Sequence, residues 1–245
     1  MENEKVKVSR IMIFAINACL LYLIAKTLIS SLIMGTGLSK PWCDCIAEGI
    51  TLILTAVMAI IQRKDAPSYG ICLGTYKGSL KYIIPLAFLA SMIIPYFIMV
   101  PVTDPFLPAL LDVIFIGIME ELIFRGLVFR AAEVFTSEGK AVIISSILFG
   151  LLHLINLSGD DPVPYVLLQV VFNAVIGLAF AALRVKTKSI LAGIIIHTFL
   201  DMNAIFVDTI SWVETAQIIM YFAVGIVLYV FYRKDAAKKA AAPAG

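Results

Sequence analysis

Eight long apolar stretches constrain the fold of this chain more than any other feature of its sequence. They cover residues 10–34, 46–62, 79–101, 107–130, 140–157, 163–184, 188–206 and 213–232. A helix of about 20 apolar residues is long enough to cross the hydrocarbon core of a bilayer. Because backbone hydrogen bonds must be satisfied within the lipid, each stretch is predicted to be a helix. The sequence therefore predicts an all-α polytopic membrane protein with eight transmembrane helices.

The composition supports this prediction and excludes other classes of protein. Of the 245 residues, 61% are hydrophobic and only 15% are charged, whereas soluble domains are nearer one half and one quarter. A water-soluble globule and a disordered chain are therefore both excluded. The formal net charge of +2 is too small to indicate a nucleic-acid-binding protein. The four cysteines form neither a CxxC pair nor a Cys/His zinc box, so no disulfide or zinc framework is indicated.

The positions of Lys and Arg predict the orientation of the helices. If the N-terminus is cytoplasmic, 16 of the 19 basic residues lie at the cytoplasmic ends of the stretches or in the cytoplasmic segments. Only Lys40 lies on the opposite side, and Lys26 and Arg125 lie within stretches. Basic residues concentrate on the cytoplasmic side of membrane proteins, so both termini are predicted to be cytoplasmic. We expect one membrane domain over residues 1–232, followed by a low-complexity, disordered tail over residues 233–245.

Three of the stretches contain ionisable side chains where a lipid-facing helix favours apolar ones. The runs are EELIFR at 120–125, FGLLH at 149–153 and HTFLD at 197–201, and the last two include both histidines of the protein. Ionisable groups in hydrocarbon are costly, so they usually face an interior cavity and mark function. These runs are therefore the candidate site.

The spacing of the runs indicates that their side chains can meet. Glu120 and His153 are 33 positions apart, on either side of the polar segment 136–139. Two antiparallel helices joined there place both residues about 20–25 Å from the turn. His197 follows a basic loop by about ten residues, which gives it a similar depth. Asp201 follows His197 at i+4 and shares its helix face. The catalytic cavity is expected between helices 4, 5, 6 and 7.

Further polar residues are expected to support this group. Glu121 and Arg125 are i,i+4 neighbours, and we interpret them as a structural ion pair. Such a pair neutralises Arg125 and leaves Glu120 to face the cavity. Asn173, in the sixth stretch, is expected either to line the cavity or to form hydrogen bonds between helices.

The three runs, in this order on successive helices, resemble the CPBP family of intramembrane glutamic proteases. That family includes the Rce1-type CAAX prenyl endopeptidases and bacteriocin-processing or immunity proteins. The resemblance covers the core at about residues 107–206, including Phe149. It implies that Glu120 and His153 hold a water molecule and that His197 and Asp201 stabilise an oxyanion.

Position 201 departs from the pattern of the prenyl-protease branch, in which this residue is typically Asn. An ionised Asp201 cannot donate a hydrogen bond to an oxyanion. Either Asp201 stays protonated in the membrane or it orients His197, and we favour the orienting role.

These residue types suit the hydrolysis of a peptide bond. Glu120 can act as the general base towards water, and His153 can orient that water and protonate the leaving amine. His197 can donate to the developing oxyanion. The sequence thus predicts an endopeptidase that acts near the membrane. The resemblance implies prenylated CAAX-type C-termini as substrates, and leader or membrane-anchored peptides are the alternative. We expect a multi-pass protein of a prokaryotic cell membrane, with a peptide substrate and lipids as partners, no nucleic acid and no cofactor.

Two other hypotheses stay open. The first is a zinc metalloprotease with His153, His197 and either Glu120 or Asp201 as ligands. Two observations argue against it: the sequence lacks an HExxH motif, and it resembles a family regarded as metal-independent. The other hypothesis is non-enzymatic: a scaffold, an immunity protein or a proton-coupled transporter that uses the same buried cluster as a relay.

Overall fold

The computed structural model describes residues 2–61, 69–94, 106–159, 161–202 and 212–241. Its elements are α1 (Glu2–Met34), α2 (Lys40–Ile61), α3 (Leu80–Ser91), α5 (Phe106–Glu120), η2 (Glu121–Val128), α6 (Phe129–Phe135), α7 (Glu138–Leu152), η3 (His153–Ser158), α8 (Val163–Thr187), α9 (Leu191–Asp201) and α11 (Trp212–Ala241). No strand occurs in these described segments. The prediction of an all-α fold is confirmed.

The helices coincide with the apolar stretches of the sequence. Five segments are long and apolar enough to cross a membrane: Arg10–Met34, Lys40–Ile61, Glu138–Leu157, Val163–Thr187 and Ala216–Ala241. Helices α3 and α9 are apolar but shorter. Elements α5, η2 and α6 follow one another without a break and form the rod expected near residues 107–130. The chain is therefore a polytopic membrane protein. Eight crossings and cytoplasmic termini stay predictions, because parts of two expected stretches, 95–101 and 203–206, lie outside the described residues.

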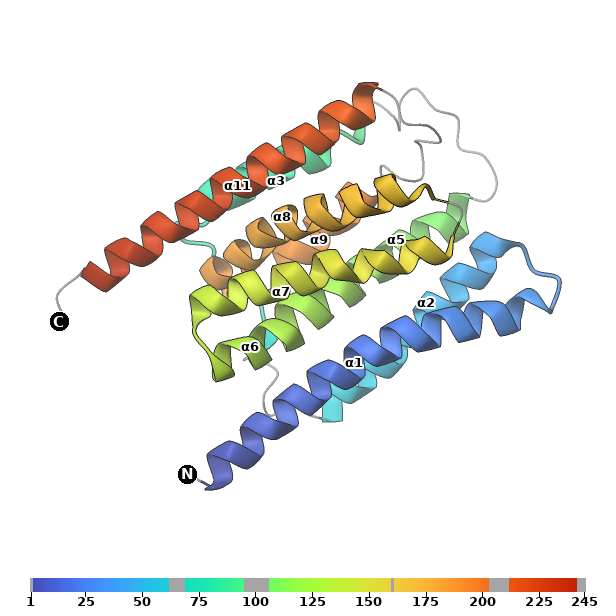
Figure 1. Ribbon diagram of the computed structural model, residues 1–245, viewed down its shortest axis with the longest axis horizontal. Coiled ribbons are helices and arrows are strands. Elements are labelled where there is room, and N and C mark those ends of the chain that lie inside the picture. Colours follow the sequence, from blue (N-terminus) through green and yellow to red (C-terminus); the bar gives the residue numbers. More distant parts are fainter. Residues whose placement is uncertain (1, 62–68, 95–105, 160, 203–211, 242–245) are drawn as a thin grey trace.

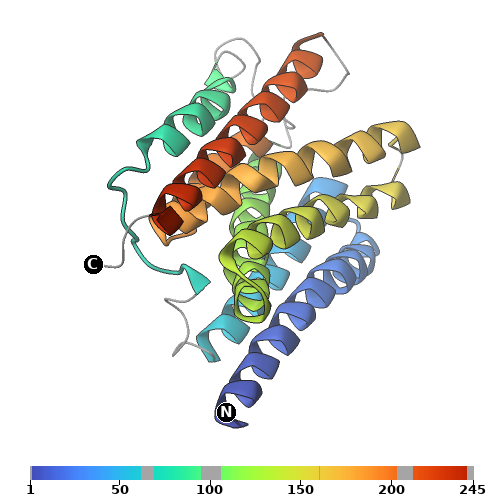
Figure 2. The same cartoon turned by 60° about the vertical axis from the view of Figure 1, so that its left-hand side comes forward.

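The rods lie side by side in a bundle with two distinct ends. In Figure 1 the start of α1 and the end of α11 lie at the same end as the turn between α6 and α7. The turn between α1 and α2 lies at the opposite end. Figure 2 shows α1 and α2 on one flank and α3 and α11 on the other, with α7 and α8 between them.

Small residues let the central helices approach closely. A Cβ added at Gly150 of α7 would overlap the carbonyl oxygen of Val170 and lie 2.9 Å from the backbone nitrogen of Ala174, both on α8. A Cβ at Gly117 of α5 would lie 3.1 Å from the backbone nitrogen of Thr198 on α9. Backbone contacts through small residues are typical of helix packing in membranes. The contact at Gly117 brings the first and the third sequence run close together.

Ion pairs join helices at the end that we expect to be cytoplasmic. Asp235 of α11 lies 2.7 Å from Lys81 Nζ and 2.6 Å from Lys186 Nζ, and the Tyr82 hydroxyl also donates to it. Helix α11 continues to Ala241, whereas we expected a disordered tail from residue 233. The Ala- and Lys-rich composition that suggested disorder also has high helix propensity, and Asp235 anchors this part of the helix to its neighbours.

Candidate active site

The two adjacent glutamates lie where the helix changes its winding. Glu120 ends α5, and Glu121 begins the eight-residue π-helix η2. π-helical turns are rare and occur frequently at functional sites. The sequence predicted an ordinary α-helix here. Both side chains are buried, and they point to different partners.

Glu121 forms the predicted ion pair with Arg125. Its Oε1 lies 3.1 Å from Arg125 Nη1, and the Arg125 side chain is 0% exposed. The guanidinium carbon lies 4.1 Å from the ring centre of Phe149 and 5.2 Å from that of Phe180. These cation–π contacts replace part of the hydration that the buried cation has lost. Arg125 is therefore held as a structural cation among aromatic rings.

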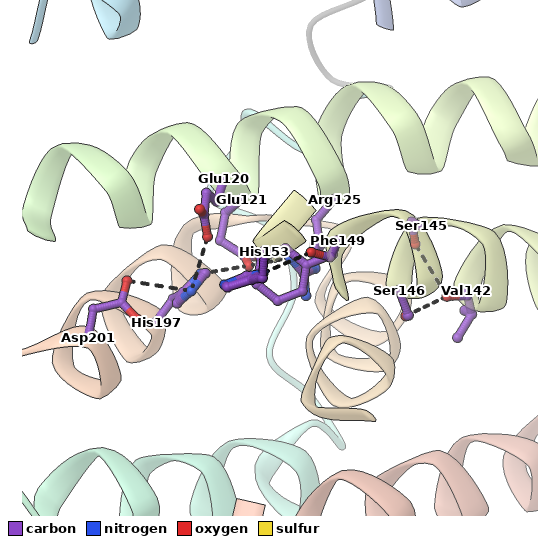
Figure 3. Close-up of polar contacts among 10 residues, drawn as sticks. All are labelled: Glu120, Glu121, Arg125, Val142, Ser145, Ser146, Phe149, His153, His197 and Asp201. Atoms are coloured by element: carbon purple, nitrogen blue, oxygen red, sulfur yellow. Dashed lines mark hydrogen bonds and ion pairs between the residues drawn. The ribbon is translucent and has the colours of Figure 1, made fainter. Parts of the chain in front are cut away.

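His197 links the two glutamates to Asp201 (Figure 3). Its Nδ1 lies 3.1 Å from Glu121 Oε1, so the carboxylate accepts a hydrogen bond from Nδ1–H. Its Nε2 lies 3.6 Å from Glu120 Oε2 and 3.6 Å from Asp201 Oδ2. A bare Nε2 lone pair facing two carboxylates would be repelled, so these three groups share at least one proton.

The ring of His197 has one more neighbour than the sequence predicted. We expected Asp201 to orient it, and the structure adds Glu121, whose carboxylate accepts the hydrogen bond that Nδ1–H donates. Asp201 lies instead on the Nε2 side, on the same face of α9 as its spacing predicted. Phe180 stacks on the imidazole with 5.1 Å between ring centres. His197 is therefore held on both ring edges and on one face.

His153 has a defined proton arrangement. Its Nδ1 lies 3.1 Å from the Phe149 carbonyl oxygen, which can only accept, so Nδ1 carries a hydrogen and the Nε2 of a neutral ring is the acceptor. The stretch predicted at 140–157 is present as the span Glu138–Leu157, but its winding changes within it: α7 ends at Leu152 and His153 begins the 3₁₀ segment η3. Phe149 lies edge-on to both imidazoles, with ring centres 5.3 Å from His153 and 5.6 Å from His197.

One cavity of about 880 Å³ joins these groups. Glu120, His153, Asn173, His197 and Asp201 all line it. The cavity was expected between the fourth, fifth, sixth and seventh stretches, and side chains from all four line it. The structure adds side chains from α1, α2 and α11, among them Tyr22, Lys26, Asp44, Gln217 and Tyr221.

Sequence reasoning missed the contribution of α1 and α2. The Tyr22 hydroxyl donates to Glu120 Oε1 over 3.1 Å. Lys26 Nζ lies 2.9 Å from Glu48 Oε2, and the Glu48 side chain is 0% exposed. The sequence does carry a signal, because Lys26 and Glu48 are ionisable residues within the first two apolar stretches. Tyr22 itself, a single tyrosine in an apolar helix, carries no signal of that kind.

The described residues contain no group of three or more His, Cys, Asp and Glu side chains arranged to hold a metal ion. The carboxylates and imidazoles of the site are instead paired with one another, with Tyr22 and with Arg125.

Comparison with known proteins agrees with the three runs. Residues 101–203 match a family model described as type II CAAX prenyl endopeptidase Rce1-like. No curated protein and no solved structure matches the chain. The matched segment contains all three sequence runs and nearly coincides with the predicted core, 107–206. The resemblance drawn from the sequence is thereby confirmed: residues 101–203 of this membrane protein match the Rce1-like family, which is a family of proteases.

Proposed function

We propose that the protein is a membrane-embedded endopeptidase in which Glu120 activates a water molecule to hydrolyse a peptide bond. The observation that carries this proposal is the convergence of one carboxyl group and two imidazoles, from three separate helical segments, on one cavity. The match to a protease family supports it independently.

The first step needs a base and an orienting acceptor. Water binds between Glu120 and the Nε2 of His153, whose Nδ1–H is occupied by the Phe149 carbonyl. As the water oxygen bonds to the substrate carbonyl carbon, one water proton moves to the Glu120 carboxylate. His153 then relays this proton to the leaving nitrogen while the C–N bond breaks. The products are a carboxyl group and an amine.

The second requirement is a donor for the oxyanion of the tetrahedral intermediate. With protons on both nitrogens, His197 keeps Nδ1–H on Glu121 and presents Nε2–H to the cavity. A fixed donor of this kind contributes several kcal/mol in typical hydrolases. Glu121 and Asp201 hold opposite edges of the ring, which is the positioning that such a donor needs.

The location of the site points to the class of substrate. A cavity among membrane helices receives peptides that the bilayer itself concentrates, namely those with a lipid or an apolar segment near the scissile bond. We therefore propose prenylated CAAX-type C-termini, leader peptides or membrane-anchored tails as substrates. No cofactor takes part in this proposal.

The test compares the wild-type protein with Glu120→Gln. Each purified protein is incubated with farnesylated peptides and membrane-protein tails, and the products are identified by mass spectrometry. The wild type is expected to release a defined product, and Glu120→Gln to be at least about 100-fold slower. Glu133→Gln is the matched control, because Glu133 pairs with Arg130 outside the cavity. No cleavage by the wild type, or full activity of Glu120→Gln, contradicts the proposal.

Chelation separates this proposal from the zinc hypothesis. Water activated by a carboxylate alone predicts unchanged cleavage after treatment with a strong chelator. A zinc enzyme would lose activity and regain it on addition of Zn²⁺.

A further inference from the structure

Tyr22 of α1 donates a hydrogen bond from its hydroxyl to the proposed base. Its side chain is 5% exposed, and its hydroxyl lies 3.1 Å from Glu120 Oε1. We infer that Tyr22 is a positioning residue that fixes the carboxyl plane of Glu120. This inference rests on the proposed function of Glu120, and it extends the site beyond the family-matched segment 101–203.

The two oxygens of Glu120 have separate partners. Oε1 accepts from Tyr22, while Oε2 faces His197 Nε2 at 3.6 Å. The terminal torsion of a glutamate side chain is broad, so a carboxyl held at one oxygen alone samples many orientations. With Tyr22 on Oε1, the carboxyl plane is fixed and Oε2 stays directed into the cavity. The oxygen that takes the proton from water is thereby kept in one place.

The Tyr22 side chain is itself held by contacts within α1 and by an ion pair between α1 and α2. Lys26, one turn further along α1, has its Nζ 5.7 Å from the centre of the Tyr22 ring. The same Nζ lies 2.9 Å from Glu48 Oε2 on α2. Cation–π attraction and this buried ion pair limit the movement of the ring. Helices α1 and α2 therefore provide a support for Glu120 that lies outside the three sequence runs.

The role of Tyr22 predicts a particular kinetic change in Tyr22→Phe. This variant keeps the ring and removes only the hydrogen bond to a charged acceptor. The loss is expected to lower kcat about 10- to 100-fold. KM is expected to change less than about threefold, because Tyr22 acts on the base and not on substrate binding.

The control is Tyr232→Phe. Tyr232 is also a buried tyrosine that donates to a glutamate on another helix, Glu138, at 3.5 Å, and it does not line the cavity. Both variants are assayed on a farnesylated peptide that the wild type cleaves.

Infrared difference spectra provide a second measurement that needs no substrate. The carboxyl band that is lost in Glu120→Gln identifies Glu120, and this band is expected to move in Tyr22→Phe and not in Tyr232→Phe.

The outcomes separate this inference from the proposed function. An unchanged kcat together with an unmoved Glu120 band in folded Tyr22→Phe overturns the role of Tyr22. Full activity of Glu120→Gln overturns the proposed function instead, whatever Tyr22 does. If Tyr22→Phe does not fold, 3-fluorotyrosine at position 22 retains the ring and makes the hydroxyl a stronger donor. The Glu120 band is then expected to move in the direction of a stronger hydrogen bond, and an unmoved band overturns the inference.

Discussion

At the scale of single residues, the two adjacent glutamates, Glu120 and Glu121, have different surroundings and therefore different roles. Glu120 lines the cavity and accepts from Tyr22, whereas Glu121 faces away from it to Arg125 and His197. A Cβ at Gly193 would lie only 2.6 Å from Glu121 Oε2, so α9 also packs directly against this carboxyl group. Glu121 is thus a structural counter-ion.

This difference predicts that replacing Glu121 lowers the stability of the protein, whereas replacing Glu120 leaves it nearly unchanged. Glu121→Gln leaves the buried Arg125 without its counter-ion, and breaking a buried pair costs about 3–5 kcal/mol. The melting temperature in detergent is expected to fall clearly, while Glu120→Gln retains a melting temperature near that of the wild type. Glu133→Gln removes a partly exposed pair worth less than about 1 kcal/mol and serves as control. Equal melting temperatures for Glu121→Gln and the wild type would contradict the structural role.

Asp201 gives a second prediction at this scale. Its Oδ2 lies 3.6 Å from His197 Nε2, and an amide there can donate or accept, as the carboxyl group does when protonated. Asp201→Asn is therefore expected to retain peptide cleavage within about tenfold of the wild type. Asp201→Leu is expected to lose most of it. Cleavage rates that fall equally in both variants would show that the charge of Asp201 is required.

At the scale of elements, departures from regular α-helix occur at the site itself. The π-helix begins at Glu121 and the 3₁₀ segment begins at His153. Both positions lie within apolar stretches, and each departure begins at a residue that carries a side chain of the site. The close contact between α7 and α8 keeps the segment from Phe149 to His153 in place.

Gly150 tests that contact. A Cβ there would overlap the Val170 carbonyl oxygen and lie 2.8 Å from the Ala174 Cβ, so Gly150→Ala must push α7 away from α8. Overpacking costs about 1–3 kcal/mol, against a gain in helix propensity of about 1 kcal/mol. We expect a lower melting temperature and reduced cleavage, because Phe149 and His153 move with α7. Gly139→Ala, whose Cβ would only touch the Tyr232 hydroxyl at 3.7 Å, is expected to behave as the wild type.

At the scale of the whole molecule, the distribution of charge predicts the orientation of the bundle in the membrane. The basic residues Lys81 and Lys186 meet Asp235 at the end of the bundle where α1 starts and α11 ends (Figure 1). Lys40 lies beside the turn at the opposite end. If the positive-inside rule holds, the first end is cytoplasmic.

Cysteine labelling in intact cells measures this orientation. Lys40→Cys and Arg233→Cys are made in a background without Cys19, Cys43, Cys45 and Cys72. Both positions are exposed, so access to the reagent is decided by the membrane. A membrane-impermeant maleimide is expected to label position 40 in intact cells, and position 233 only after permeabilisation. Labelling of position 233 alone in intact cells would reverse the orientation.

Much of this architecture could be predicted from the sequence because it follows from local patterns. Apolar length indicated the helices, and the spacing of Glu120, His153 and His197 indicated a shared site. The π-helical turn at Glu121 and the 3₁₀ turn at His153 could not be predicted, because they depend on how neighbouring helices pack. Tyr22 was missed for a similar reason: a single tyrosine in an apolar helix has no pattern, and only the packing of α1 brings it to Glu120.

The central claim is that water activated at Glu120 attacks the peptide bond directly. Single-turnover cleavage of a farnesylated peptide in H₂¹⁸O tests it most directly, with mass spectrometry of both the product and the protein fragment that contains Glu120. We expect one ¹⁸O atom in the new carboxyl group of the product, no label in the Glu120 fragment, and no product from Glu120→Gln. Label in the Glu120 fragment would indicate covalent attack by the carboxylate, and product formation by Glu120→Gln at the wild-type rate would contradict the account altogether.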